Sequence, residues 1–323
     1  MVSTTLPNVA VARAPTRRPP PLRQHLPAYL MCAPTILLFL VFMVFPIGFV
    51  LYGSFLDWDG IGSIRRARWI GLANYRQLAV DEIWWLAVRN TILYALIKLA
   101  VELPLALALA LILSGKLRGR TAFRTIGFMP VITSIAVVSL AFTFFFAPIG
   151  GPVNDLLVNR LGWLETPIAF LGERAYAFWT VTGVAVWHDL GINMVFFLAA
   201  LQTVPRDLHE AAIVDGASSW QRFRAVTLPA IRPITVIIVT LSLAGSLKVF
   251  DYFAVMTAGG PGFSTTTMVL YMFRYTSFGG GGLAGATTIP AVGYGSTVAI
   301  ALGLVILAAI ALQQMINRWQ VRN

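Results

Sequence analysis

The chain has 323 residues, of which 58% are hydrophobic and 11% are charged, and its formal net charge is +11. Soluble globular proteins usually carry about 25% charged residues, so this composition excludes an ordinary soluble protein and places the apolar excess against lipid. A single cysteine, Cys32, excludes a disulfide framework or a thiolate metal site within the chain.

The first 28 residues are rich in proline and arginine, and we expect them to form a disordered cytoplasmic tail. Six long apolar runs follow, and each reaches or exceeds the roughly 20 residues that a helix needs to cross a hydrocarbon core. We predict an all-α integral membrane protein with spans at residues 29–55, 91–113, 125–146, 176–201, 234–256 and 292–316. The first run is too long for the apolar region of a signal peptide, and no small-residue cleavage site follows it.

The lysines and arginines predict how the six spans are oriented. If both termini are cytoplasmic, fourteen of these cations lie in cytoplasmic segments and eight lie in external loops. Cytoplasmic loops of membrane proteins carry an excess of Lys and Arg, so this orientation is favoured. The basic net charge is therefore interpreted as a topology signal, and no nucleic-acid partner is expected.

The longest external loops are expected at residues 56–90, 147–175 and 257–291. The last contains a run of four glycines at 279–282, which is typical of a flexible linker. A phosphate-binding P-loop needs Gly-x-x-x-x-Gly-Lys-Ser/Thr after a strand, and the sequence contains no such motif. The chain is thus expected to bind no ATP by that route, and ATP-driven work would require a partner.

The polar loop between the fourth and fifth predicted spans contains two helix start signals. Asp207 can cap a short helix with Glu210 three residues later, and Ser218 with Gln221 matches the capping-box pattern. We expect two short helices on either side of a turn at Gly216. Glycine there would allow an unusual backbone conformation or the close approach of a partner.

This loop reads Glu210-Ala211-Ala212, then Gly216 after three residues, then Val-Thr-Leu-Pro at 226–229 after nine more. The pattern resembles the cytoplasmic loop in permease subunits of binding-protein-dependent ABC importers. Five weaker matches in the expected order resemble the subgroup that imports sugars, like the maltose permease. They lie at residues 70–75, 90–91, 119–130, 151–154 and 257–261.

The resemblance implies the six-helix type I importer fold over residues 29–323, with a coupling loop at 202–233. It also implies a second permease subunit in a heterodimer, two ATPase subunits that use ATP and Mg, and an extracytoplasmic sugar-binding protein. This chain itself would bind no cofactor and would be no enzyme. It would lie in a bacterial or archaeal cell membrane and pass a carbohydrate by alternating access. The alternatives are a polyol or glycerol phosphate as cargo, or an ATP-independent carrier or channel.

The loop residues that would dock on the ATPase subunits share small size, charge or aromatic character. They are Glu210, Ala211, Ala212, Asp215, Gly216, Trp220, Phe223, Leu228 and Pro229. Glu210 would offer a carboxylate to an arginine, while Trp220 and Phe223 would supply aromatic anchors. A solvated helix–turn–helix without a partner is the alternative.

Two pairs of ionisable residues fall inside predicted spans, where such groups normally face protein or a water-filled path. Lys98 and Glu102 are one helical turn apart, so we predict an ion pair between them. Lys248 and Asp251 are three residues apart, and for them a structural pair and a polar pathway remain equally open.

The resemblance to the maltose permease implies a substrate path along the fourth and fifth spans. Position by position, it implicates His188, Asp189, Leu190, Gly191, Met194, Ser242, Gly245, Ser246, Val249 and Tyr252. Short polar side chains suit a hydroxyl-rich ligand, and Tyr252 could stack on a sugar ring. No nucleophile accompanies His188 and Asp189, so a catalytic role is not expected, and no metal site is predicted.

Overall fold

The computed structural model describes residues 26–115, 118–277 and 291–322. It divides into two compact units, residues 1–49 and 50–323, and each is taken by itself. The first contains α1 (Leu26–Phe39), a π-helical turn (Leu40–Val44) and the start of α2 (Phe45–Gly53). These segments make up one candidate span, Leu30–Gly53, where the first span was predicted. The glycine run at 279–282 lies outside the described residues.

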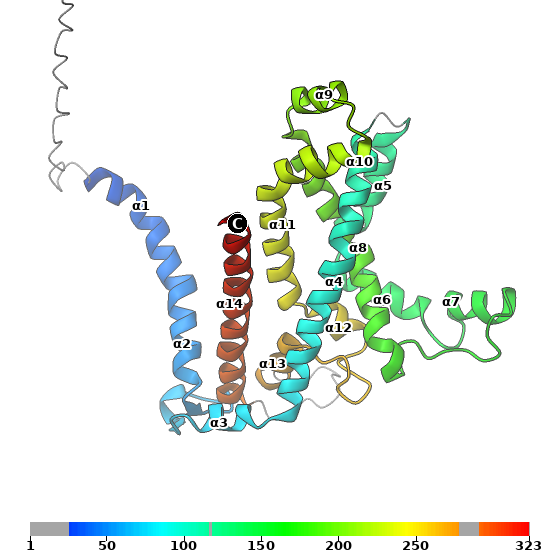
Figure 1. Cartoon of the computed structure of the whole chain (residues 1–323). Helices are drawn as coiled ribbons and strands as arrows, with labels where there is room; N and C mark the ends of the chain where they lie inside the picture. Colours follow the sequence, from blue (N-terminus) through cyan, green and yellow to red (C-terminus); the bar gives the residue numbers. More distant parts are fainter. Residues whose placement is uncertain (1–25, 116–117, 278–290, 323) are drawn as a thin grey trace, which may run out of the picture. The chain divides into compact units, whose positions relative to one another are not determined.

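Four long helices form the body of the second unit (Figure 1). They are α4 (Glu82–Ser114), α8 (Arg174–Gln202), α11 (Leu228–Leu247) and α14 (Val292–Arg322). Each belongs to a segment long and apolar enough to cross a membrane, so the described chain has five such segments with the first unit included. The predicted all-α, multi-pass membrane fold is confirmed.

The third predicted span is not one continuous helix, which corrects the expectation for residues 125–146. It consists of α5 (Arg120–Ile132) and α6 (Ile135–Phe145), which meet at an angle of 95°. Thr133 and Ser134 between them have extended backbone, and Pro130 lacks the N–H that would continue the helical hydrogen bonds. If this bent pair counts as one span, the described chain has six candidate spans, as predicted from the sequence.

The fifth predicted span is also interrupted. The helix α11 ends at Leu247, and α12 (Asp251–Met256) begins after three non-helical residues. The carbonyl oxygen of Val249 in this gap accepts a hydrogen bond from the Thr267 hydroxyl, at 3.0 Å. Broken helices are tolerated at membrane depth where side chains satisfy the freed backbone groups in this way.

Small side chains let α4 and α8 pack closely along their length. Ala106 and Ala110 of α4 are fully buried in one cluster with Met194 of α8, and Ala185 of α8 is fully buried beside Tyr94 of α4. Small residues are typical of helix interfaces in membranes because they let backbones approach. On its α5 side, α8 comes so close that a Cβ at Gly191 would lie 2.4 Å from the carbonyl oxygen of Gly127.

Short elements cover the two ends of the four-helix body. At one end lie α9 (Arg206–Val214) and α10 (Ser219–Arg222), with a π-helical turn (Phe223–Thr227) leading into α11. At the opposite end lie α3 (Ala73–Ala79) and α13 (Met268–Thr276) (Figure 1). The remaining short elements are β1 (Leu56–Asp57), a 3₁₀ turn (Ile64–Arg66), β2 (Arg68–Trp69), α7 (Pro152–Asn154) and a π-helical turn (Asp155–Arg160). The two strands pair antiparallel, with Leu56 opposite Trp69.

Candidate functional site

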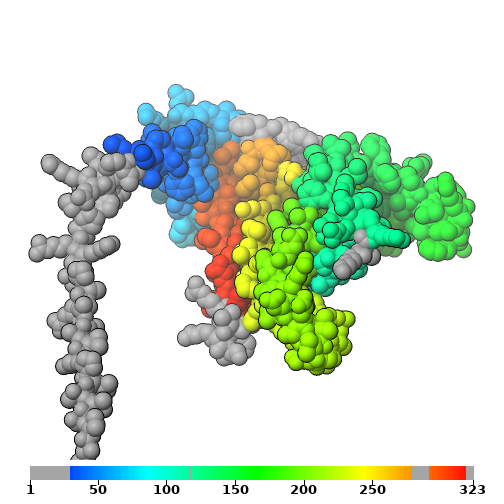
Figure 2. Space-filling view, turned by 90° about the horizontal axis from the view of Figure 1, so that it is seen from above, coloured from blue at the N-terminus to red at the C-terminus, as the bar shows by residue number. Residues whose placement is uncertain are grey.

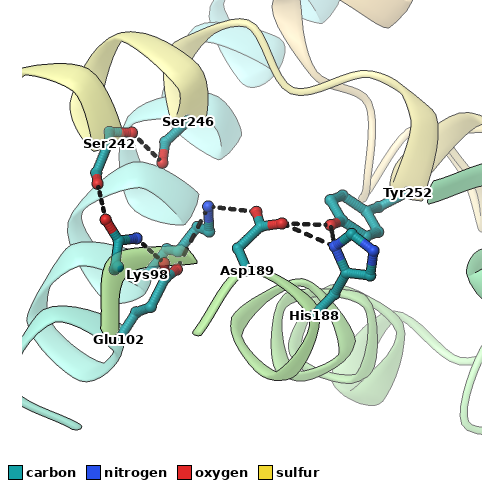
Figure 3. Close-up of polar contacts among 8 residues, drawn as sticks. Lys98, Glu102, His188, Asp189, Ser242, Ser246 and Tyr252 are labelled. Atoms are coloured by element: carbon teal, nitrogen blue, oxygen red, sulfur yellow. Dashed lines mark hydrogen bonds and ion pairs between the residues drawn. The ribbon is translucent and has the colours of Figure 1, made fainter. Parts of the chain in front are cut away.

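A buried polar network crosses the middle of the four-helix body (Figure 3). The ammonium of Lys98 on α4 lies 3.3 Å from Glu102 Oε2 and 2.7 Å from Asp189 Oδ2 on α8. The predicted Lys98–Glu102 ion pair is therefore confirmed. The sequence did not indicate the shorter contact, with Asp189, because it joins residues 91 positions apart. One lysine thus links two carboxylates on neighbouring helices.

On one side, the network continues to α11. The side-chain amide of Asn193 on α8 donates to Glu102, and its oxygen accepts from the Ser242 hydroxyl at 3.0 Å. Ser246 points its hydroxyl back to the Ser242 carbonyl oxygen, at 2.8 Å. Ser242 is thus a link between helices, whereas Ser246 bonds, within the described chain, only inside its own helix.

On the other side, the network reaches the break between α5 and α6. The Tyr252 hydroxyl lies 3.0 Å from Asp189 Oδ1 and 2.7 Å from Nδ1 of His188 (Figure 3). The other ring nitrogen of His188, Nε2, lies 3.2 Å from the Thr133 carbonyl oxygen. A carbonyl only accepts hydrogen bonds, so this contact requires a proton on Nε2. His188 therefore satisfies a backbone group that the helix break leaves free.

A cavity of about 320 Å³ opens beside this network, and we call it the central cavity. It is bounded by α4, α6, α8, α11, α12 and the non-helical residues between α11 and α12. Its lining consists of Tyr94, Lys98, Ile135, Asp189, Ile192, Asn193, Phe196, Leu241, Ser242, Gly245, Lys248, Val249, Phe250, Asp251 and Tyr252.

Half of the predicted path residues line this cavity, namely Asp189, Ser242, Gly245, Val249 and Tyr252. The other five do not line it, namely His188, Leu190, Gly191, Met194 and Ser246. Gly191 instead lies against the backbone of α5, and Met194 is packed in the apolar core between α4, α8 and α11.

The second ionisable pair, Lys248 and Asp251, also lines the central cavity. Both side chains are exposed, and no ion pair joins them in the part of the chain that the structure describes. Of the two alternatives, a structural pair is therefore absent from the described conformation. Residues that the sequence analysis missed, such as Tyr94 and Phe196, carry no polar or spacing signal that marks them as lining a cavity.

The loop at the α9 end forms the two predicted short helices. The predicted cap at Asp207 is wrong, because Pro205 is the N-cap and no side chain caps α9. Asp207 lies in the first turn instead, where its negative charge interacts favourably with the positive end of the helix dipole. The predicted capping box of Ser218 and Gln221 is confirmed, since each side chain bonds the other residue's backbone N–H.

Gly216 ends α9 with a left-handed backbone, at φ +77°. The N–H of Ala217 donates to the carbonyl oxygen of Ala212, and the N–H of Gly216 donates to the carbonyl oxygen of Ile213. These two hydrogen bonds form a Schellman motif. A Cβ at Gly216 would meet no atom within 4 Å, so its conformation rather than close packing requires glycine within this chain.

The α9 loop, residues 206–227, exposes several large apolar side chains. Val214 is 87% exposed and Trp220 is 68% exposed, while Leu208 and Ile213 are each at least half exposed. Glu210 and Ala211 lie on the same exposed helix, and the rings of Trp220 and Phe223 lie 5.4 Å apart. Several large apolar side chains exposed on one short loop are typical of a protein-binding surface.

At the opposite end, a carboxylate joins three elements. Asp81 accepts hydrogen bonds from the hydroxyls of Tyr271 and Tyr294 and from the backbone N–H groups of Ile83 and Trp84. Burial alone would raise the pKa of Asp81, but the two tyrosine bonds and the two backbone bonds outweigh it and lower this pKa below its ordinary value. Burial and the bond to Asp81 raise the pKa of Tyr271, so this hydroxyl stays protonated.

Comparisons with known proteins agree with this architecture. The family model of the binding-protein-dependent transport system inner membrane component matches residues 102–322. The trehalose/maltose transport system permease protein of Thermococcus litoralis is 32% identical over 265 residues, which cover 81% of this chain and 87% of that protein. The lactose transport system permease protein of Rhizobium radiobacter is 32% identical over 288 residues, which cover 88% and 92%.

Solved structures show the same fold. A chain from the crystal structure of a bacterial ABC transporter involved in the import of the acidic polysaccharide alginate matches with a TM-score of 0.76 and 25% identity. The match covers 92% of this chain and 96% of that one. A chain from a bacterial alginate ABC transporter in complex with an alginate pentasaccharide-bound periplasmic protein matches with a TM-score of 0.75 and 24% identity.

Proposed function

The chain belongs to the family of inner membrane components of binding-protein-dependent transport systems, and on that premise we propose that it forms the translocation path of an ABC importer for a sugar or oligosaccharide. One of the two permeases above is named for trehalose and maltose and the other for lactose, which supports a sugar as cargo. The central cavity is the observation that carries the proposal, because it lies among the spans beside two helix breaks and a buried polar network.

The chemistry of the central cavity suits an uncharged ligand with many hydroxyls. Lys248 and Asp251 offer a donor and an acceptor that no ion pair occupies in the described chain, and Ser242 adds a hydroxyl. Tyr252 and Phe250 supply apolar ring surface of the kind that sugar rings stack on. The lining holds two lysines and two aspartates, so it has no excess of cations for a phosphate. Glycerol phosphate is therefore the weaker candidate.

A glycine pair tests whether the sugar passes through this cavity. Gly245 lines it, and a Cβ there would meet no atom within 4 Å. Gly183 on α8 has equal free space but lies outside the central cavity. We expect Gly245→Leu to reduce uptake of labelled maltose, trehalose and lactose by the reconstituted importer at least tenfold, and Gly183→Leu to leave it within twofold. Unchanged uptake in Gly245→Leu would place the path elsewhere.

The proposal extends to the partners. A second permease subunit completes the path, an extracytoplasmic binding protein delivers the sugar, and two ATPase subunits bind the α9 loop and hydrolyse ATP with Mg. The exposed apolar surface at Val214 and Trp220 supports this contact, as does the absence of any P-loop motif from the sequence. Closure of the ATPases would then move the spans and alternate access to the central cavity.

The orientation can be tested by thiol labelling. With both termini cytoplasmic, the α9 loop faces the cytoplasm and residues 147–175 face outside. In a Cys32→Ser background, Glu165→Cys should react with an impermeant maleimide in intact cells, whereas Ser218→Cys should react only after permeabilisation. Both positions are exposed, so access to the side chain is not limiting. The reverse pattern would invert the topology.

Glu210 tests the ATPase contact. If its carboxylate pairs with a basic group in the interface, Glu210→Ala should weaken the binding free energy of the ATPase subunits by about 2–5 kcal/mol. Fewer ATPase subunits should then stay bound during purification. The matched change Glu165→Ala, at an exposed position in another loop, should have no effect. Full retention and full sugar-stimulated ATP hydrolysis in Glu210→Ala would show that this residue is not part of the interface. If the wild-type chain itself binds no ATPase subunit, the carrier or channel alternative is favoured.

A further inference from the structure

A second cavity lies beside the α9 loop, with a volume of about 630 Å³, and we call it the basic cavity. Arg120 and Arg124 of α5 line it together with Arg206 and His209 of α9. No aspartate or glutamate among the described residues lines it. Figure 2 views the molecule from this end and shows the blue-green surface of α5 beside the yellow-green surface of the α9 loop.

The arginines of this cavity lack anionic partners within the described chain. The Nη2 of Arg124 donates to the carbonyl oxygen of Leu113, at 2.8 Å, near the end of α4. Its Nε atom is buried and has no hydrogen-bond partner among the residues that the structure describes. Arg120 and Arg206 are exposed and form no ion pair with the residues that the structure describes. A buried donor without a partner is costly, so the cavity is incomplete without an acceptor.

We propose that the basic cavity binds a phosphate group, carried by an anionic lipid headgroup or by a soluble phosphate ester. The planar guanidinium group matches two phosphate oxygens at once, which distinguishes arginine from lysine as a phosphate ligand. Basic pockets between membrane helices at the cytoplasmic side are typical sites for lipid headgroups. The cytoplasmic location of this cavity rests on the proposed orientation, whereas the binding chemistry does not.

The apolar part of the lining makes a lipid the first source to test. Leu111 of α4 and Leu198 and Leu201 of α8 line the same cavity as the arginines. The glycerol and first acyl carbons of a phospholipid would cover these side chains, whereas a soluble phosphate ester would leave them against water. A bound phosphate would also connect α5 with α9, the helix that we assign to ATPase docking.

The test is direct binding to the complete importer, purified with its ATPase subunits. Native mass spectrometry would count bound lipid during titration with phosphatidylglycerol, with phosphatidylcholine as the neutral control, and a parallel titration would use inorganic phosphate. Arg120→Gln and Arg206→Gln each remove one exposed cation from the cavity. Arg118→Gln removes an exposed cation from the same segment that does not line the cavity, and is the matched control.

Each of the two cavity variants should weaken phosphatidylglycerol binding roughly fivefold and the double variant roughly 25-fold, while Arg118→Gln stays at the wild-type level. If inorganic phosphate shows this pattern and the two lipids bind alike, the site stands with a soluble phosphate ester as its source. If neither probe responds to the cavity variants, the proposal is wrong. Binding that appears only after removal of the ATPases would also overturn it, because an acidic group of the partner would then occupy the cavity.

Discussion

The two ends of the four-helix body satisfy their backbone in different ways. At the α13 end, the loop at residues 257–267 is held by distant parts of the chain, and Thr265, Thr266 and Thr267 are fully buried. Asn90 on α4 donates to the carbonyl oxygens of Ser264 and Thr266, each at 3.0 Å and across more than 170 positions. Contacts within the described chain therefore hold this loop in place.

The α9 loop shows the opposite arrangement. Its hydrogen bonds, in the Schellman motif at Gly216 and the capping box at Ser218, join residues no more than five positions apart. Its largest apolar side chains remain exposed. The bonds that shape this loop are thus local, and its apolar side chains remain open to solvent, as expected of a segment that a partner completes.

The largest effect expected from this comparison comes from Asn90. Asn90→Leu keeps the side-chain size but leaves two carbonyl oxygens of the loop without donors, so the free energy of unfolding should fall by about 2–4 kcal/mol. Thermal unfolding of the purified importer in detergent measures the change. Asn159→Leu is the control, since this asparagine is exposed and its side chain bonds, among the described residues, only to Asp155. Equal stability of the two variants would show that the α13 end is not held by Asn90.

A smaller effect is expected at Asp81, whose carboxylate joins Tyr271 and Tyr294 at the same end. Its pKa in the folded chain is lowered from an ordinary value of 3.8, so the ionised form stabilises the fold. That stability is fully present above about pH 3.8 and is lost as the pH falls through the lower folded pKa.

Asp81→Asn should therefore destabilise the chain by about 1–2 kcal/mol at neutral pH, because charged hydrogen bonds become neutral ones. It should also reduce the fall in unfolding temperature between pH 5 and pH 3. Glu165→Gln removes an exposed carboxylate that makes no hydrogen bond or ion pair within the described chain, and it should leave this pH profile unchanged. An unaltered profile in Asp81→Asn would assign the acid sensitivity to other groups.

At the α9 end, Gly216→Ala should act locally. A non-glycine residue in the left-handed region costs about 1 kcal/mol, which should raise amide hydrogen exchange in α9 while the unfolding temperature of the importer stays the same. Retention of the ATPases should fall together with helicity. Gly183→Ala lies in a helix where a Cβ has free space, so it should change neither property. A fall in global stability in Gly216→Ala would contradict the local character of this loop.

The smallest effect belongs to the capping box. Ser218→Ala removes the side-chain acceptor for the Gln221 N–H and should cost about 0.5–1 kcal/mol, again confined to exchange in α10. Ser264→Ala at the other end provides the comparison, because its hydroxyl makes no hydrogen bond in the described chain. Faster exchange in α4 or α13 after Ser218→Ala would show that the two ends are coupled.

What the sequence predicted well depends on neighbours along the chain. The places of the apolar runs, the capping box and the Lys98–Glu102 pair follow from spacings of a few residues, and the structure confirms them. The breaks within the third and fifth predicted spans were not expected. The cap at Asp207 was wrong because two residues upstream Pro205 already supplies the extended backbone that starts the helix.

The remaining features depend on contacts between distant segments. Nothing in the local sequence marks the unwound residues 248–250, which contain neither glycine nor proline, although Thr267 satisfies the backbone there. The contact of Lys98 with Asp189 and the lining of the central cavity likewise need the relative placement of α4, α8 and α11. For this reason half of the residues assigned to the path by resemblance fall outside the cavity.

The position of the charges in α4 and α8 has a consequence for biogenesis. As the chain emerges from the ribosome, α4 must enter the bilayer well before Asp189 is synthesised, so Lys98 cannot rely on that carboxylate during insertion. Glu102, one turn along the same helix and 3.3 Å away, provides a counter-charge that travels with it. The nascent helix can therefore leave the translocon with the charge of Lys98 already balanced by Glu102. When α8 inserts later, Asp189 contacts a lysine that is already in the membrane.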